Sequence, residues 1–199
     1  NKPVDIKEWG MPAHMVNAYY NPQKNLIVFP AAILQAPFYS LEQSSSANYG
    51  GIGAVIAHEI SHAFDSNGAS FDEYGSLNNW WTEEDYAAFE SRTQQVIDQF
   101  EGQDSYGAKI NGKLTVSENI ADLGGIAAAI EAAKSEEDFS AEEFFTNFAR
   151  IWRMKARPEF MQMLASVDVH APGHLRTNIQ LPNFDEFHET FGVQEGDGM

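Results

Sequence analysis

Hydrophobic and polar positions follow two different periods along this chain, and together they predict a small β-hairpin followed by several helices. Two β-prone runs, residues 16–20 and 26–29, flank the segment Asn21-Pro22-Gln23-Lys24-Asn25, which has turn chemistry. Pro30 ends the second run, because proline cannot donate a hydrogen bond to a strand ladder. The hairpin is either a surface element packed on the core or an edge that offers unpaired backbone groups to an extended peptide.

Segments with helical periodicity occupy most of the chain after the hairpin. Thr82 and the acidic residues behind it are typical of a helix start, and Ser140-Ala141-Glu142-Glu143 matches a capping box. Pro158 suits the first turn of a short helix, and Asn183 is expected to cap the last one. The pattern predicts a loop over residues 168–176 and helices over residues 82–100, 115–133, 140–154, 158–166 and 183–191.

A further predicted helix contains the sequence Ala57-His58-Glu59-Ile60-Ser61-His62-Ala63-Phe64-Asp65. Residues four apart lie on one helix face, so His58 and His62 project side by side with Glu59 next to them. Two imidazoles at this spacing can hold one zinc ion, and the neighbouring carboxylate can act as a general base. The same short pattern also occurs by chance in unrelated proteins, and a third ligand elsewhere would distinguish the two interpretations.

Hydrophobic residues continue along the whole of this helix, which predicts that it is largely buried. The glycines of Gly50-Gly51-Ile52-Gly53 precede it and allow other backbone to approach closely, and Asn67-Gly68 is expected to stop it. A buried helix that carries two histidines and a glutamate must satisfy their polar groups, and a metal ion does so directly. The apolar positions are Ile52, Val55, Ile56, Ile60, Ala63 and Phe64.

Glu118 and Asp122 lie four residues apart in the predicted helix 115–133 and therefore share one of its faces. Two interpretations of Glu118 remain open. Thr115-Val116-Ser117-Glu118 matches a capping box, in which the glutamate folds back on the helix start. Alternatively, Glu118 is the third metal ligand and Asp122 orients a ligand histidine, because such carboxylates hold imidazoles in the required tautomer.

Composition limits the class of protein and the chemistry of any site. The 199 residues suffice for one domain or two small ones, and a hydrophobic content of 43% permits a real core. The chain contains no cysteine, so a metal site must use histidine and carboxylate ligands. A net charge of -17 argues against nucleic-acid binding, and no apolar run approaches the length of a membrane span.

Six separated motifs occur along almost the whole chain. They cover residues 16–20, 27–31, 48–53, 58–65 and 117–122, and residues 168–173 together with Arg176. In this order they resemble the neprilysin and endothelin-converting-enzyme family of zinc endopeptidases, and the likeness is greatest to bacterial PepO-type oligopeptidases. One such match would be weak, whereas six in the order of the family are specific.

The resemblance implies an α+β fold, mostly α, in which residues 1–199 form a zincin-like (gluzincin) catalytic lobe with a small hairpin beside the histidine-bearing helix. It implies that one Zn²⁺ is held by His58, His62 and Glu118, with Glu59 as the catalytic base and Asp122 behind a ligand histidine. His170 would stabilise the oxyanion, although from the residues alone it is an ordinary loop histidine. Substrate contacts are implied at Asn17, Ala18 and Arg176, and a pocket for a large apolar side chain at Phe38, Val55, Ile151 and Trp152.

The expected function is therefore cleavage of oligopeptides on the amino side of large hydrophobic residues. The resemblance also implies a large N-terminal helical domain that this sequence does not include, and a chain that continues beyond Met199. We therefore expect a catalytic lobe that binds zinc but cleaves poorly without that domain.

Two other functions are considered. One is an inactive zinc-binding relative that serves as a binding module. The other is an aminopeptidase, which would need a glutamate motif that captures a free amino terminus, and the sequence shows no clear motif of this kind. The lack of cysteine favours a bacterial source, with the cytoplasm as the expected location and the cell surface or secretion also open.

Overall fold

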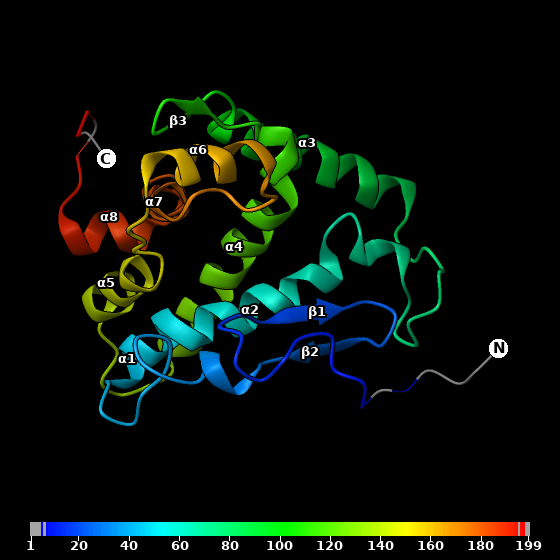
Figure 1. Ribbon diagram of the computed structural model, residues 1–199, viewed down its shortest axis with the longest axis horizontal. Coiled ribbons are helices and arrows are strands. Elements are labelled where there is room, and N and C mark those ends of the chain that lie inside the picture. Colours follow the sequence, from blue (N-terminus) through cyan, green and yellow to red (C-terminus); the bar gives the residue numbers. More distant parts are fainter. Residues whose placement is uncertain (1–4, 6, 195, 198–199) are drawn as a thin grey trace.

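The computed structural model describes residue 5, residues 7–194 and residues 196–197, and helices make up most of it (Figure 1). The two longest are α3 (Glu83–Phe100) and α4 (Gly112–Ala133). The predicted class, α+β and mostly α, is confirmed. Within the described ranges, none of the helices combines the length and the hydrophobicity that a membrane crossing requires. The shorter α-helices are α1 (Ser45–Asn48), α2 (Ala54–Ser61), α5 (Ala141–Ile151), α6 (Pro158–Val167), α7 (Gly173–Asn178) and α8 (Asp185–Phe191).

The predicted hairpin is present, with shorter strands than expected. Strand β1 (Tyr19–Asn21) pairs antiparallel with β2 (Leu26–Val28), and Tyr20 lies opposite Ile27. A second hairpin, β3 (Asp104–Ser105) with β4 (Ala108–Lys109), was not predicted. Its turn places Tyr106 and Gly107 at positive φ, 56° and 88°. Turns of this kind usually carry glycine, asparagine or aspartate at both positions, so the tyrosine at the first one gave no sign of a hairpin in the sequence.

Helix α2 lies at the centre of the molecule, between the β1–β2 hairpin and α4 (Figure 1). The helical chain continues into it from α1 through one π-helical segment, η2 (Tyr49–Gly53), and ends in a 3₁₀ turn, η3 (His62–Phe64). The α-helix therefore ends well before the predicted stop at Asn67-Gly68. Gly68 begins a further 3₁₀ turn, η4 (Gly68–Ser70), and is needed for close approach: a Cβ there would lie 2.1 Å from the His62 carbonyl oxygen.

Helix α4 packs closely along α2 because a glycine lies at their contact. A Cβ on Gly125 would lie 2.7 Å from the His58 backbone nitrogen. The helix also begins earlier than predicted, at Gly112, and the Asn111 side chain caps it by accepting a hydrogen bond from the Leu114 N–H. Glu118 therefore lies beyond the first turn, and the capping-box interpretation of residues 115–118 is wrong.

Three helices begin at their predicted signals. Thr82 and Asp85 form a reciprocal capping box at the start of α3. The Ser140 hydroxyl accepts a hydrogen bond from the Glu143 N–H at the start of α5, and Pro158 occupies the first turn of α6. These local signals act within one turn of the chain, which explains why the sequence alone reveals them.

Two predictions near the C-terminal end are wrong. Asn183 lies in the 3₁₀ turn η5 (Leu181–Asn183), and the residue that precedes α8 is Phe184. The loop expected over residues 168–176 is shorter, because α7 begins at Gly173 directly after Pro172. A proline before a helix start is as compatible with a helix as with a loop, and the pattern did not distinguish them.

Three clusters of buried hydrophobic side chains hold these elements together. One joins α4, α5 and α8, a second joins α3, α6 and α7 with α4 packed against it, and a third lies beneath the hairpin. Helix α2 contributes Ala54 and Val55 to them. However, Ile56, Ile60 and Phe64 are 37%, 48% and 55% exposed, so the prediction that this helix is largely buried does not hold for one of its faces.

Candidate metal centre

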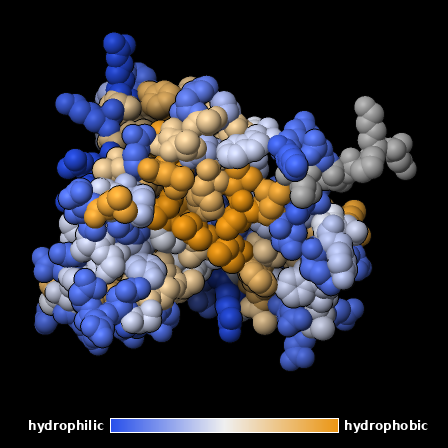
Figure 2. Space-filling model, turned by 90° about the horizontal axis from the view of Figure 1, so that it is seen from below, coloured by the Kyte–Doolittle hydropathy of each residue, from blue (hydrophilic) through white to orange (hydrophobic). Residues whose placement is uncertain are grey.

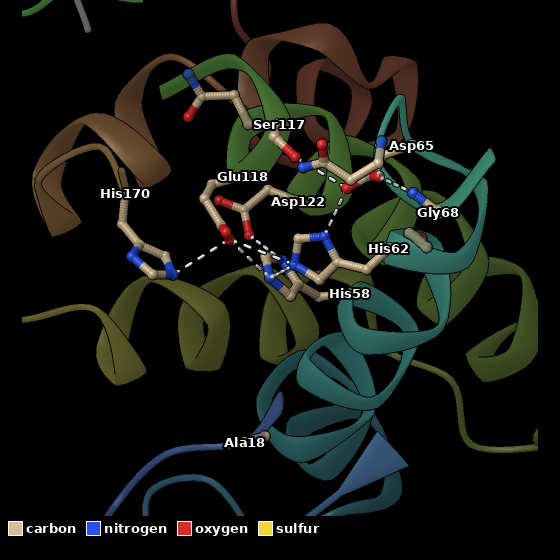
Figure 3. A network of polar contacts seen from close by, with 12 residues as sticks. Ala18, His58, His62, Asp65, Gly68, Ser117, Glu118, Asp122 and His170 are labelled. Atoms are coloured by element: carbon tan, nitrogen blue, oxygen red, sulfur yellow. Dashed lines mark hydrogen bonds and ion pairs between the residues drawn. The ribbon is translucent and has the colours of Figure 1, made fainter. Parts of the chain in front are cut away.

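Three potential metal ligands meet between α2 and α4 (Figure 3). His58 and His62 project from α2 and the turn that follows it, and Glu118 projects from α4 toward them. The Glu118 Oε2 atom lies 3.2 Å from His58 Nε2 and 3.4 Å from His62 Nε2. The two Nε2 atoms are 3.1 Å apart. The structure thus brings together the three residues that were predicted as zinc ligands.

The spacing and chemistry of these atoms fit one zinc ion. Zinc bonds of about 2.0–2.2 Å in a tetrahedral arrangement place neighbouring ligand atoms roughly 3.3 Å apart, close to all three separations. Two histidines and one carboxylate are a donor set of zinc hydrolases that leaves a fourth position open. Two imidazole nitrogens and a carboxylate oxygen this close together need a shared cation, either a proton or a metal ion.

Asp122 lies behind His58, as predicted from its spacing to Glu118. Its Oδ1 atom is 2.9 Å from His58 Nδ1, and the Arg176 guanidinium donates to both carboxylate oxygens, at 2.7 Å and 2.6 Å. The guanidinium also lies over the Trp152 ring. Burial raises the pKa of Asp122, but the charge of Arg176 and the bond to His58 outweigh it and hold the pKa at about 2. The carboxylate is therefore ionised and directs the Nδ1 proton of His58.

Asp65 supports His62 in the same way, a role that was not predicted from the sequence. Its Oδ2 atom is 2.9 Å from His62 Nδ1 and accepts a 2.8 Å hydrogen bond from the Ser117 hydroxyl. Its Oδ1 atom accepts hydrogen bonds from the backbone N–H groups of Asn67 and Gly68. The available signal was the spacing of three residues from His62, which one turn of helix brings back to the imidazole.

His170 approaches the same cluster from the segment before α7 (Figure 3). Its Nε2 atom is 3.2 Å from Glu118 Oε2, and its Nδ1 atom is 2.8 Å from Asp168 Oδ1. The Asp168 carboxylate, which was not predicted to have a role, also accepts the His170 backbone N–H. The imidazole remains 44% exposed, so it can meet a molecule that enters from solvent.

The protonation of the cluster follows from this convergence. Burial lowers the pKa of His62, but hydrogen bonds to Asp65 and Glu118 raise it to about 10, and the pKa of His58 is also raised. Burial raises the pKa of Glu118, yet its bonds to three histidines, including His170, depress it well below its ordinary value. Protons thus hold the ligands together, and a bound metal ion would displace them.

Glu59 lines the cleft beside the ligands and is 6% exposed. Burial raises the pKa of its carboxyl group, and the nearby His58 and His62 oppose this shift. The backbone of Tyr20, in β1, also opposes the rise in pKa. A carboxylate with a raised pKa at the mouth of a metal site is suited to accept a proton.

The cleft above these residues has a volume of about 440 Å³. Of the predicted substrate contacts, the structure places Asn17, Ala18, Phe38, Val55 and Trp152 in its wall. The described residues that line it do not include Ile151, whose side chain packs against the cluster beneath the hairpin. Arg176 also lines the cleft, but its guanidinium is bound to Asp122 and is 6% exposed as a residue, so a direct substrate contact stays a prediction.

Comparison with known proteins places this geometry in a family. The model of peptidase family M13 matches residues 17–199. The neutral endopeptidase of Lactococcus lactis subsp. lactis is 64% identical over 196 residues, which are 98% of this chain and 31% of that relative. The chain thus spans about a third of the length of this relative.

Solved structures agree with this result. The crystal structure of PepO from Lactobacillus rhamnosis matches with a TM-score of 0.93 at 48% identity, covering 98% of this chain and 31% of that one. A zinc metalloprotease of Mycobacterium tuberculosis, solved with an inhibitor, matches with a TM-score of 0.90 at 42% identity, covering 98% and 32%. The resemblance to PepO-type zinc endopeptidases and the fold class are confirmed, and the chain belongs to peptidase family M13.

Proposed function

We propose that this chain is the catalytic part of a zinc endopeptidase that hydrolyses oligopeptides. The observation that carries the proposal is the convergence of His58 Nε2, His62 Nε2 and Glu118 Oε2 at 3.1–3.4 Å, with Glu59 in the same cleft. Zinc bound by these three side chains would polarise the scissile carbonyl group and lower the pKa of a water molecule. A site in which the metal served only to stabilise the fold would not need Glu59, so its presence favours a catalytic site.

The side chains of the cleft supply the remaining steps. Glu59 accepts the proton of the attacking water and passes it to the leaving amine, which requires a pKa near the working range. His170 donates a hydrogen bond to the oxygen that becomes negative, and one such donor lowers a barrier by about 3 kcal/mol. Asp168 keeps the His170 imidazole in one orientation through its bond to Nδ1. Asp122 and Asp65 do the same for the ligand histidines.

The walls of the cleft suggest how a peptide is held. Asn17 and Ala18, directly before β1, lie in the wall of the cleft, and the Ala18 N–H donates to the Asn17 side-chain oxygen. An extended chain would meet the Asn17 amide and the neighbouring backbone, as it does at an edge strand. Phe38, Val55 and Trp152 would receive a large hydrophobic side chain on the carboxyl side of the cleaved bond. Arg176 uses Nε and Nη2 to bind Asp122, so only its remaining nitrogen could reach a peptide carbonyl.

The remainder of the polypeptide in M13 relatives would complete the enzyme, because this chain covers 31% of the Lactococcus lactis relative. We propose that the lobe alone binds zinc and cleaves peptides poorly. The alternative is a zinc-binding module without activity, which would bind peptides and not cleave them. That residues 1–199 form one domain, and that the protein is cytoplasmic and bacterial, stay predictions; fractionation of the source cells would test the location.

The experiment uses a hybrid in which this chain replaces the 196 matching residues of the Lactococcus lactis neutral endopeptidase. We expect the hybrid to cleave an N-acetylated peptide before a phenylalanine. Glu59→Gln should retain zinc, measured by elemental analysis, and lose roughly 10²- to 10⁴-fold in kcat/KM because the base is gone. Glu42→Gln, on an exposed loop, is the control. Normal turnover by the Glu59→Gln hybrid would refute the proposal, and binding without cleavage by the unsubstituted hybrid would favour the alternative.

A further inference from the structure

Helix α2 has two faces of opposite character. His58 and His62 point into the cleft, and Ile56, Ile60 and Phe64 lie on the other side of the helix. These three residues, here called the outer face, are spaced four apart and therefore form one continuous stripe. They are 37%, 48% and 55% exposed, which is unusual for large apolar side chains that follow one another along a helix.

The surroundings of the outer face are also apolar and partly uncovered. Phe64 packs edge-on against Trp80, which is itself 49% exposed. On the neighbouring helix, Gly124 lies against Ser61, and the next turn of α4 leaves Ala127 and Ala128 exposed. Seen from below, the molecule carries a patch of hydrophobic side chains across the middle of its surface (Figure 2). An uncovered stripe on one helix beside small residues on the next is a shape into which another helix packs.

Two possible occupants fit the observations less well. A peptide substrate belongs in the cleft, on the opposite side of α2, where the potential ligands lie. A second copy of the chain would bring together two molecules that each carry a formal net charge of -17, and this repulsion opposes association. The comparison with relatives supplies a third occupant, because this chain corresponds to only 31% of the Lactococcus lactis enzyme.

We infer that the outer face of α2 is the docking surface for the part of the M13 polypeptide that this chain does not span. That part would place an apolar helix or segment on Ile56, Ile60 and Phe64. An α-helix as short as α2 gains little stability from its own hydrogen bonds and depends on packing. Docking would therefore hold the helix that carries His58 and His62 from behind. The inference rests on family membership and on exposure, and it does not require the proposed activity.

The chain offers a direct test because it contains no cysteine. In the hybrid, with the cysteines of the added part replaced by serine, Ile60→Cys is treated with a maleimide in buffer and in urea. Leu41→Cys, at a position that is 86% exposed on a distant loop, is the matched control. We expect labelling of Ile60→Cys to be slowed roughly tenfold or more by folding, because the thiol reacts only after local opening. Labelling of Leu41→Cys should change little.

Two other results of this experiment would overturn the inference. If Ile60→Cys in the folded hybrid labels as fast as Leu41→Cys, the outer face is open and the inference is overturned. If Ile60→Cys is protected only at high protein concentration, where light scattering shows a dimer, a second copy covers the outer face and the inference is also overturned. Should the hybrid not fold, the same substitution at the aligned position of the unaltered Lactococcus lactis enzyme gives the same readings. Labelling does not report catalysis, so an inactive hybrid with a protected Ile60→Cys would leave this inference standing while the proposed function fails.

Discussion

The two ligand histidines of this chain are held by different kinds of support. Asp122, behind His58, is bound at both oxygens by Arg176, so a buried ion pair connects α4 with α7. Asp65, behind His62, is held by the backbone N–H groups of the following turn and by the Ser117 hydroxyl. One support is a pair of charges from distant segments, and the other consists of neutral donors, most of them local.

The difference separates two ways in which a protein can orient a ligand. Removing one partner of a buried ion pair leaves an uncompensated charge, which is strongly destabilising. When a carboxylate is held by several neutral donors, removal of one donor costs only one hydrogen bond of modest strength. We therefore expect the Asp122 support to couple zinc binding to the stability of the whole fold. The Asp65 support should affect zinc binding more than stability.

Asp122→Asn should produce the largest effect. The substitution leaves Arg176 buried without a counter-charge, and we expect the free energy of unfolding to fall by about 3–5 kcal/mol. Zinc affinity of the hybrid should fall roughly 10- to 100-fold, because His58 loses its anionic partner. Urea unfolding and zinc titration against a chelator measure the two quantities.

A second substitution tests whether the lost stability comes from the unpaired charge. Adding Arg176→Met to Asp122→Asn removes that charge, so stability should recover in part while zinc affinity stays low. If the double variant also recovers zinc affinity, the Asp122 carboxylate is not needed to orient His58, and the proposed difference between the two supports is wrong. If neither variant differs from the parent in stability, the buried pair contributes nothing to the fold.

Gly125→Ala should disturb the packing of α2 on α4 at His58 without touching either carboxylate support. The new methyl group would lie 2.7 Å from the His58 backbone nitrogen and 2.9 Å from its Cα, so α2 and α4 must move apart. We expect a loss of about 1–3 kcal/mol in the free energy of unfolding, the range for overpacked contacts, together with weaker zinc binding. Thermal unfolding with and without a chelator measures both.

Gly124→Ala is the matched control, one residue away in the same helix. Its methyl group would meet the Ser61 hydroxyl, the end of a side chain that can rotate, and not backbone. It should therefore cost less, and zinc affinity should stay near that of the parent. Equal losses for the two variants would mean that the spacing of α2 and α4 does not set the ligand geometry.

Asp65→Asn should have a smaller effect on stability than Asp122→Asn. The amide can still accept from the loop, so we expect a loss of about 1–2 kcal/mol, while zinc affinity falls roughly tenfold. Asp72→Asn is the control, because Asp72 also accepts two backbone N–H groups, from Tyr74 and Ser76, but has no histidine beside it. It should lose similar stability and keep zinc affinity. A loss of affinity in both variants would show that loop order, and not the carboxylate on His62, holds the metal.

These supports also show which parts of the site the sequence could reveal. His58, Glu59 and His62 are read from helical spacing alone, and Asp122 from its distance of four residues to Glu118. Asp65 has an equally local signal, its spacing of three residues from His62, but no role was assigned to it from the sequence. Local spacing therefore shows which side chains can meet, and not which of these contacts the protein uses.

Other features depend on contacts that spacing cannot supply. The pairing of Arg176 with Asp122 joins residues far apart in the chain, and only the fold brings them together. The capping interpretation of Glu118 could be excluded only once Asn111 was seen to start α4. Similarly, the apolar pattern of α2 identified hydrophobic positions correctly, but a pattern does not say which of them this chain itself covers.

Ser117→Ala tests the weakest member of the Asp65 support and should have the smallest effect. The substitution removes one 2.8 Å hydrogen bond to the Asp65 carboxylate and leaves the two backbone donors in place. We expect a loss of about 1 kcal/mol, seen as a roughly fivefold faster release of zinc to a chelator. Ser166→Ala is the control, since the hydroxyl of that serine donates to the Gln162 carbonyl oxygen of its own helix. Its zinc release should match the parent. If the two variants release zinc at the same rate, Asp65 is fixed by the loop alone, and the two histidine supports differ even more sharply, one by an ion pair and the other by backbone.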